Sequence, residues 1–407
     1  MSFLQFMNLV PELQELVARN CEAHELLALA QTCSSLHGLA IRALYYDVDI
    51  SVHNLPGYFP CFYGGTVDVL AQNPRAELGS RAQTCHKRQD MFVDALKLHP
   101  EHGQRVVRLT WTYFDRWDPV AEEFLNDEPL WVALQVLKAV KYLDFAVLTW
   151  QRELVPPPPL FPRAQHIRLL GEMSFAFVRA ILLSSDPENF ISLDLDNLQD
   201  YGEFHGGDFV NLADLSLIPE HEDDQGNPVV RHPGTMRGHL RRLEGRCRNL
   251  RRLSLRSVGN DDHRDAKWSQ TIDEARYQEW AAFIHSTRFT LECLTIEQGL
   301  EPTQTNIGRC RPQRIHYGLP MEDRFIDHLL PTLLTGSFPK LKDLRVYGIG
   351  APPRSEMVQA FRPKHPDIRG YVDEKLSAAF GPGVELEVRE HATKRFYYHL
   401  NGATYDS

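Results

Sequence analysis

Apolar residues near the start of the chain recur with the period of a helix. Between residues 11 and 21 they fall on one helical face: Leu13, Leu16, Val17 and Cys21. Pro11 stands where this helix begins, since its missing N–H costs nothing in a first turn, and Glu12 suits the positive end of the helix dipole. The pattern predicts an amphipathic helix over residues 11 to 20.

A second helix is predicted from Glu25 to Ala40. Its apolar stripe contains six residues: Leu26, Leu29, Ala30, Cys33, Leu36 and Ala40. Leu27 and Leu39 widen this stripe, so the helix must contact more than one surface. One interpretation is a helical hairpin that only caps the rest of the fold. The other is that part of its apolar surface contacts a different protein.

From residue 106 onward a short leucine pattern recurs. Its closest copies, "NLADLSL" at 211–217 and "NLRRLSL" at 249–255, both read Leu-x-x-Leu-x-Leu. Looser copies follow a similar spacing: "VVRLTW" at 106, "YLDFAV" at 142, "HIRLL" at 166, "FISLDL" at 190, "TLECLTI" at 290, "KLKDLRV" at 340 and "VELEV" at 384. The copies align on nine positions: Leu109, Leu143, Ile167, Leu193, Leu215, Leu253, Leu294, Leu344 and Leu386.

Each copy predicts a strand with one apolar face, because alternate residues of a strand point to the same side. Stacking such units builds a parallel sheet with a continuous core, and some separations fall within the roughly 20–29 residues of a leucine-rich repeat. The longer separations require insertions, one of which, residues 272–289, has helical periodicity. An ordinary α/β sheet would give similar spacing and stays open as the alternative.

An ordered set of residues leads from the first predicted helix into a short strand: Pro11, Glu12, Leu13, Val17, Leu26, Leu29, Cys33 and then "LYYDVDI" at 44–50. This set resembles the F-box of fungal proteins, in which the motif also continues into a strand. Val10, Cys21 and Glu25 stand where Leu, Leu and Asp are more common in that family.

The resemblance implies a contact with a Skp-type adaptor, which joins F-box proteins to a cullin–RING ubiquitin ligase. The implied adaptor-binding residues are Pro11, Glu12, Leu13, Leu16, Val17, Leu26, Leu27, Leu29, Ala30 and Cys33. Which of these face the adaptor and which face the protein's own core stays open at the level of sequence.

A second set, spaced as "W..FI......LE.L.IE.G", is similar to the leucine-rich half of fungal F-box proteins: Trp280, Phe283, Ile284, Leu291, Glu292, Leu294, Ile296, Glu297 and Gly299. We therefore expect an α/β protein, with an N-terminal F-box-like helical hairpin followed by an irregular leucine-rich-repeat solenoid of parallel strands, helices and long insertions. The expected divisions are an F-box-like domain over 1–50, a linker or helical connection over 51–105 with a helix near 88–98, and a leucine-rich-repeat-like domain over 106–400.

Composition narrows the class of protein. A net charge of -10 argues against general binding to nucleic acid or to an anionic membrane. Seven scattered cysteines without a CxxC pair indicate free thiols, and the chain has neither a basic leader nor a run of about 18 apolar residues. We expect a cytoplasmic or nuclear protein, or one found in both.

No motif in the sequence indicates catalysis. GxSxG, GxxxxGK[ST] and HExxH are all absent, so we expect no enzyme activity and no cofactor. "CHKR" at 85 and "CRPQRIH" at 310 lack the paired spacing of a zinc site, so no metal site is expected either.

Arginines crowd one segment, where a single acid, Glu244, interrupts nine of them: Arg231, Arg237, Arg241, Arg242, Arg246, Arg248, Arg251, Arg252 and Arg256. One interpretation is a solvated surface paired with acids elsewhere. The other is a docking patch for an acidic or phosphorylated target segment, with Arg237, Arg241 and Arg242 as its candidates. Trp117, just after a predicted strand, is a further candidate for a target-binding rim.

The resemblance, together with the absence of catalytic motifs, implies a non-catalytic substrate receptor of an SCF-type ubiquitin ligase. It would bind a Skp-type adaptor through the N-terminal hairpin and a target protein through the repeat domain. The alternative is a scaffold protein of the same architecture that acts outside a ubiquitin ligase.

Overall fold

The structure is a computed structural model of the chain. It describes residues 6, 8–53, 74–114, 117–118, 123–124, 127–148, 159–173, 175–200, 221–222, 228–229, 234–236, 238–258, 266–299, 324–350 and 365–389.

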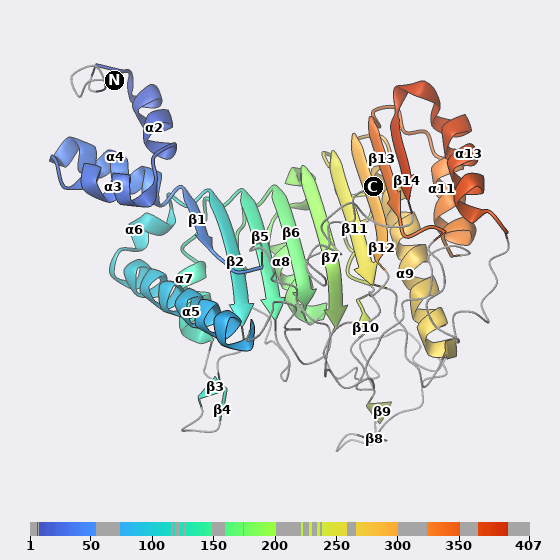
Figure 1. Ribbon diagram of the computed structural model, residues 1–407, viewed down its shortest axis with the longest axis horizontal. Helices are drawn as coiled ribbons and strands as arrows, with labels where there is room; N and C mark the ends of the chain where they lie inside the picture. Colours follow the sequence, from blue (N-terminus) through green and yellow to red (C-terminus); the bar gives the residue numbers. More distant parts are fainter. Residues whose placement is uncertain are drawn as a thin grey trace.

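In this part of the chain, nine parallel strands form one continuous sheet whose spatial order follows the sequence (Figure 1). The strands are β1 (Asp47–Ile50), β2 (Arg108–Phe114), β5 (Tyr142–Leu148), β6 (His166–Glu172), β7 (Ser192–Asp200), β11 (Arg252–Val258), β12 (Cys293–Gly299), β13 (Asp343–Tyr347) and β14 (Glu385–Arg389). Three shorter pairings also occur: β10 (Gly234–Thr235) on β7, β3 (Trp117–Asp118) with β4 (Glu123–Phe124), and β8 (His221–Glu222) with β9 (Pro228–Val229), all antiparallel.

Three helices precede β1, and the other helices lie between later strands of the described chain. The helices are α2 (Pro11–Arg19), α3 (Ala23–Ala30), α4 (Ser34–Leu44), α5 (Pro74–Leu98), α6 (Pro100–Gly103), α7 (Glu128–Leu134), α8 (Phe175–Ser184), α9 (Ala266–Thr287), α11 (Leu330–Thr335) and α13 (Ile368–Phe380). Short 3-10 turns, η1 (Pro187–Asn189) and η6 (Gly381–Gly383), and a π-helical turn, η5 (Phe325–Leu329), complete the described elements.

One apolar row crosses the whole sheet in register. Its members are direct partners on neighbouring strands: Val48, Leu109, Leu143, Ile167, Leu193, Leu253, Leu294, Leu344 and Leu386. A second row lies two residues further along each strand: Ile50, Trp111, Phe145, Leu169, Leu195, Leu255, Ile296, Val346 and Val388. Helices α5, α7, α8, α9, α11 and α13 pack against these rows and form one core with them.

The predicted alignment is confirmed at eight of its nine positions, because eight of those residues occupy the first row. The ninth, Leu215, lies outside the described residues. In the described sheet, Leu193 of β7 pairs directly with Leu253 of β11. The architecture is therefore an α/β parallel sheet that is compatible with a solenoid.

Two predicted helices are present, and both begin earlier than predicted. The helix near 88–98 is the end of α5, which stops at Leu98, two residues before Pro100. It contributes Phe92, Val93 and Leu96 to the main core. The helical insertion predicted at 272–289 corresponds to α9. Among the described residues, no helix combines the length and the apolar character that crossing a membrane requires.

The predicted helix from Glu25 to Ala40 is wrong, because the chain forms α3 and α4 there instead. The N–H groups of Gln31 and Thr32 bond back to the carbonyls of Ala28 and Leu29, and the Thr32 hydroxyl donates to the Leu29 carbonyl at 2.7 Å. Cys33 then takes an extended conformation, φ -159 and ψ 164, from which α4 starts. The N-terminal hairpin is therefore a group of three helices, which stands beside β1 at one end of the sheet (Figure 1).

Burial along the first apolar row predicts that shortening its leucines to alanine destabilises the protein by different amounts. Leu294→Ala, at a fully buried position of β12, should lower the free energy of unfolding by about 2–5 kcal/mol. Leu386→Ala, at the half-buried edge strand, should cost distinctly less. Urea unfolding monitored by circular dichroism measures both, and equal losses would contradict this account of the core.

Candidate protein-binding site

The three N-terminal helices have a small core of their own. Its buried residues are Ala18, Leu26, Leu36, Leu39, Ala40 and Ala43, with Phe6, Cys21, Leu29, Ala30 and Leu44 partly buried against them. Local bonds set the helix ends: Pro11 opens α2, and the side chains of Glu22 and Glu25 form a capping box at the start of α3. Several other apolar side chains of these helices are not part of this core.

Those remaining residues face solvent. Val10, Leu13, Leu16 and Val17 are 56%, 47%, 56% and 38% exposed, and we call these four the apolar ridge. Their spacing places them on one side of α2. Leu27 of α3 is also exposed, so this small unit holds five of the ten exposed large apolar side chains of the described chain. A concentration of this kind is typical of a protein-binding surface.

The structure divides the ten adaptor-binding candidates by their burial. Seven are exposed: Pro11, Glu12, Leu13, Leu16, Val17, Leu27 and Cys33. Leu26 is buried in the helical core, and Leu29 and Ala30 are half-buried against it. Val10 was missed among the candidates because it precedes the helix, although its spacing from Leu13 and Val17 matches the same face.

Specific contacts hold α2 against the start of the sheet. The guanidinium of Arg19 lies 3.6 Å from the centre of the Tyr46 ring, and Arg19 also pairs with Glu15. The backbone N–H groups of Val107 and Arg108 each donate to the Tyr46 carbonyl at 3.0 Å, which joins β2 to the end of the helical unit. These contacts therefore attach α2, with the apolar ridge, to the start of the sheet.

The target-binding candidates lie apart from the ridge. Arg241 and Arg242 are exposed on a turn rather than on a helix, and Arg237 is outside the described residues. Trp117 belongs to β3, in a short pairing after β2, and its side chain is not described. Part of the arginine segment is paired with acids: Arg248 with Glu188, Arg251 with Glu292, and Arg256 with Asp196 and Glu297.

Opposite the apolar rows, charged side chains alternate in sign across five adjacent strands. We call them the charged row: Asp144, Arg168, Asp196, Arg256 and Glu297. Arg168 reaches Asp144 at 3.2 Å and Asp196 at 3.0 Å, and Arg256 reaches Asp196 at 3.2 Å and Glu297 at 3.3 Å. Sequence reasoning missed this row, although each member directly neighbours an apolar-row residue in the repeat.

The pKa values of two acids near the Glu297 end of the charged row are shifted. Burial raises the pKa of Glu297 to about 8, although Arg256 opposes the shift, and Asp196 and Asp194 add to it. Burial likewise raises the pKa of Asp194 on β7. The fold thus favours the protonated form of Glu297 more than the unfolded chain does.

No protein-family model matches the sequence, and no curated protein matches it.

Glu297 makes stability depend on pH. A carboxyl whose pKa is about 8 in the fold and 4.5 in the unfolded chain stabilises the fold fully below pH 4.5, and this contribution is lost as the pH rises through 8. Glu297→Gln stays neutral, so its stability relative to the native chain should rise between these pH values, by about 1.4 kcal/mol per pH unit at most.

Urea unfolding at several pH values measures this difference. Glu385→Gln, at an exposed position of β14, is the matched control and should run parallel to the native chain. A pH-independent offset for Glu297→Gln would contradict the raised pKa.

Proposed function

We propose that this protein is the substrate-recognition subunit of an SCF-type cullin–RING ubiquitin ligase. In this proposal the three N-terminal helices are an F-box-like domain that binds a Skp-type adaptor. The parallel sheet and its helices are an irregular leucine-rich-repeat solenoid that presents a target protein. The proposal combines the resemblance of the motif in residues 11–50 with the surface that those residues leave exposed.

The apolar ridge is the single observation that carries the proposal. Leu13 and Leu16 lie on the outer side of helices that already have a core, so a partner can cover them without unfolding the unit. Burying the exposed half of each such side chain contributes about 1 kcal/mol. Because association itself is costly, polar contacts around the ridge must complete the interface.

The proposed role requires a rigid connection rather than a catalytic group. The receptor would act by proximity, because a target held near the ubiquitin-transferring enzyme meets it at a high effective concentration. The Arg19–Tyr46 stack and the backbone bonds to the Tyr46 carbonyl favour this role, since they keep the adaptor surface and the sheet in one orientation. A scaffold outside a ubiquitin ligase would use the same surfaces and is the alternative.

Substitution of the ridge separates these functions. Leu13→Asp combined with Leu16→Asp should abolish co-purification with a co-expressed Skp-type adaptor while the circular dichroism spectrum stays unchanged, because both side chains are outside the helical core. Val132→Asp, at a 53% exposed apolar position on α7, is the matched control and should retain the adaptor. Failure of the native chain to bind the adaptor would favour the scaffold.

Substitution of Arg241 and Arg242, which lie on one turn, tests target recognition separately. If Arg241 and Arg242 bind a phosphorylated target segment, replacing both with alanine should weaken binding of phosphopeptides from a labelled library. The loss should be clear, since both side chains are exposed and available. A variant of Arg248, which already pairs with Glu188, is the control. Equal binding by the double variant and the native chain would remove this role.

A further inference from the structure

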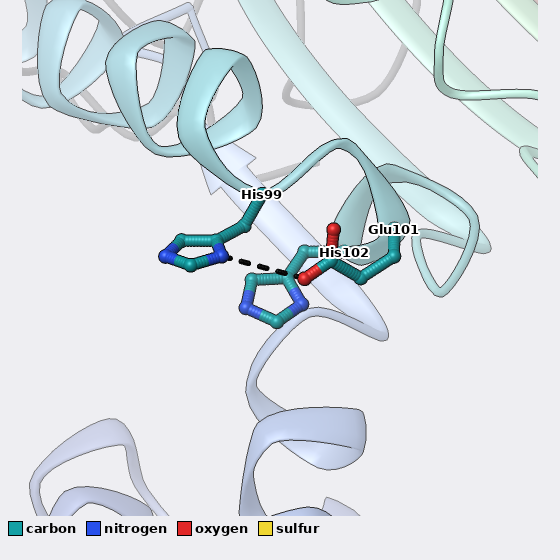
Figure 2. Close-up of side chains that lie close together, drawn as sticks. All are labelled: His99, Glu101 and His102. Carbon is teal, nitrogen blue, oxygen red and sulfur yellow. Dashed lines mark ion pairs between the residues drawn. The ribbon is translucent and has the colours of Figure 1, made fainter.

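Two histidines and a glutamate meet where the helical unit joins the sheet. Figure 2 shows His99, Glu101 and His102 close together at α6. Each offers one ligand atom, and the three atoms lie within 4.8 Å of one another. Within the described residues, this is the one group of three or more histidine, cysteine or acidic side chains with such geometry.

The spacing of these atoms suits a small divalent ion. Nδ1 of His99 lies 3.4 Å from Oε1 of Glu101. Two ligand atoms about 2.1 Å from a tetrahedral zinc ion are themselves roughly 3.4 Å apart, so this pair needs little rearrangement. Imidazole nitrogen with carboxylate oxygen is a donor set that zinc and related transition ions favour over calcium or magnesium.

His102 supplies the third position. Its Nδ1 atom is buried and has no hydrogen-bond partner in the described part of the chain. Its ring lies 5.3 Å from the His99 ring and 4.7 Å from the ring of Tyr45, the residue that ends α4. The Tyr45 contact orients this imidazole, and an oriented ligand binds a metal more tightly than a mobile one.

The geometry points to a transition-metal site, of zinc type, formed by His99, Glu101 and His102 at the junction between the helical unit and the sheet. Three protein ligands leave a further position open to water or to a partner's side chain. Because His102 packs on Tyr45, a bound ion would also stiffen the junction. This inference is independent of the adaptor-binding function, since none of its residues belongs to the apolar ridge.

Calorimetric titration of the full-length protein with Zn²⁺ tests the site. We expect binding of one ion that His99→Ala or Glu101→Gln weakens roughly ten- to hundredfold. Both side chains are mostly exposed, at 60% and 59%, so these variants should fold normally. Zn²⁺ should also raise the melting temperature of the native chain more than that of either variant.

His24→Ala is the matched control, because His24 pairs with Glu22 at 3.2 Å on the surface but has no third ligand there within the described part of the chain. It should leave Zn²⁺ binding unchanged. Substitution with Co²⁺ then distinguishes the ligands: the expected spectrum lacks a sulfur-to-cobalt charge-transfer band. Zn²⁺ affinity that is unchanged in His99→Ala and Glu101→Gln, or a thiolate spectrum, would overturn the assignment.

Discussion

The in-register contact between leucines of neighbouring strands is the constraint on which the structure depends. Leu253 lies between Leu193 and Leu294 in the first apolar row, and no strand of the sheet can bury its own member alone. Because side chains alternate along a strand, a slip by one residue would bring Asp194 or Arg256 into the core. The same register that builds the core therefore also builds the charged row on the opposite face.

The helical unit depends on this sheet for its position but not for its core. β1 pairs with β2 as the first strand, and the Tyr46 carbonyl accepts two backbone bonds from the residues that lead into β2. Three short helices have too little interior to enclose all their apolar side chains, so Leu13 and Leu16 remain outside. An exposed apolar surface attached to the sheet is the combination that the proposed receptor function requires.

The leucine rows could be predicted because apolar residues occupy alternate positions in each repeat, which is the pattern of a strand with one apolar face. The break between α3 and α4 could not be predicted from the apolar stripe, because the stripe continues through Cys33 without interruption. Thr32 and the serines after Cys33 favour a helix end, and this local effect prevails in the structure. The "NLADLSL" segment lies outside the described residues, and the repeat spacing alone did not indicate that β7 and β11 pair directly. The candidate site could be predicted only in part, because periodicity does not show which apolar residues are buried. It cannot separate Leu26, which is buried, from Leu27, which is exposed.

Charge pairing explains why the ridge, rather than the charged row, is the stronger candidate for recognition. Each arginine of that row already contacts two or more acids, so a partner would have to break these contacts before it could bind the same groups. Covering Leu13 or Leu16 removes only water from apolar surface, which is favourable. The charged row is therefore best understood as structural, because its ion pairs link adjacent strands on the face opposite the apolar rows.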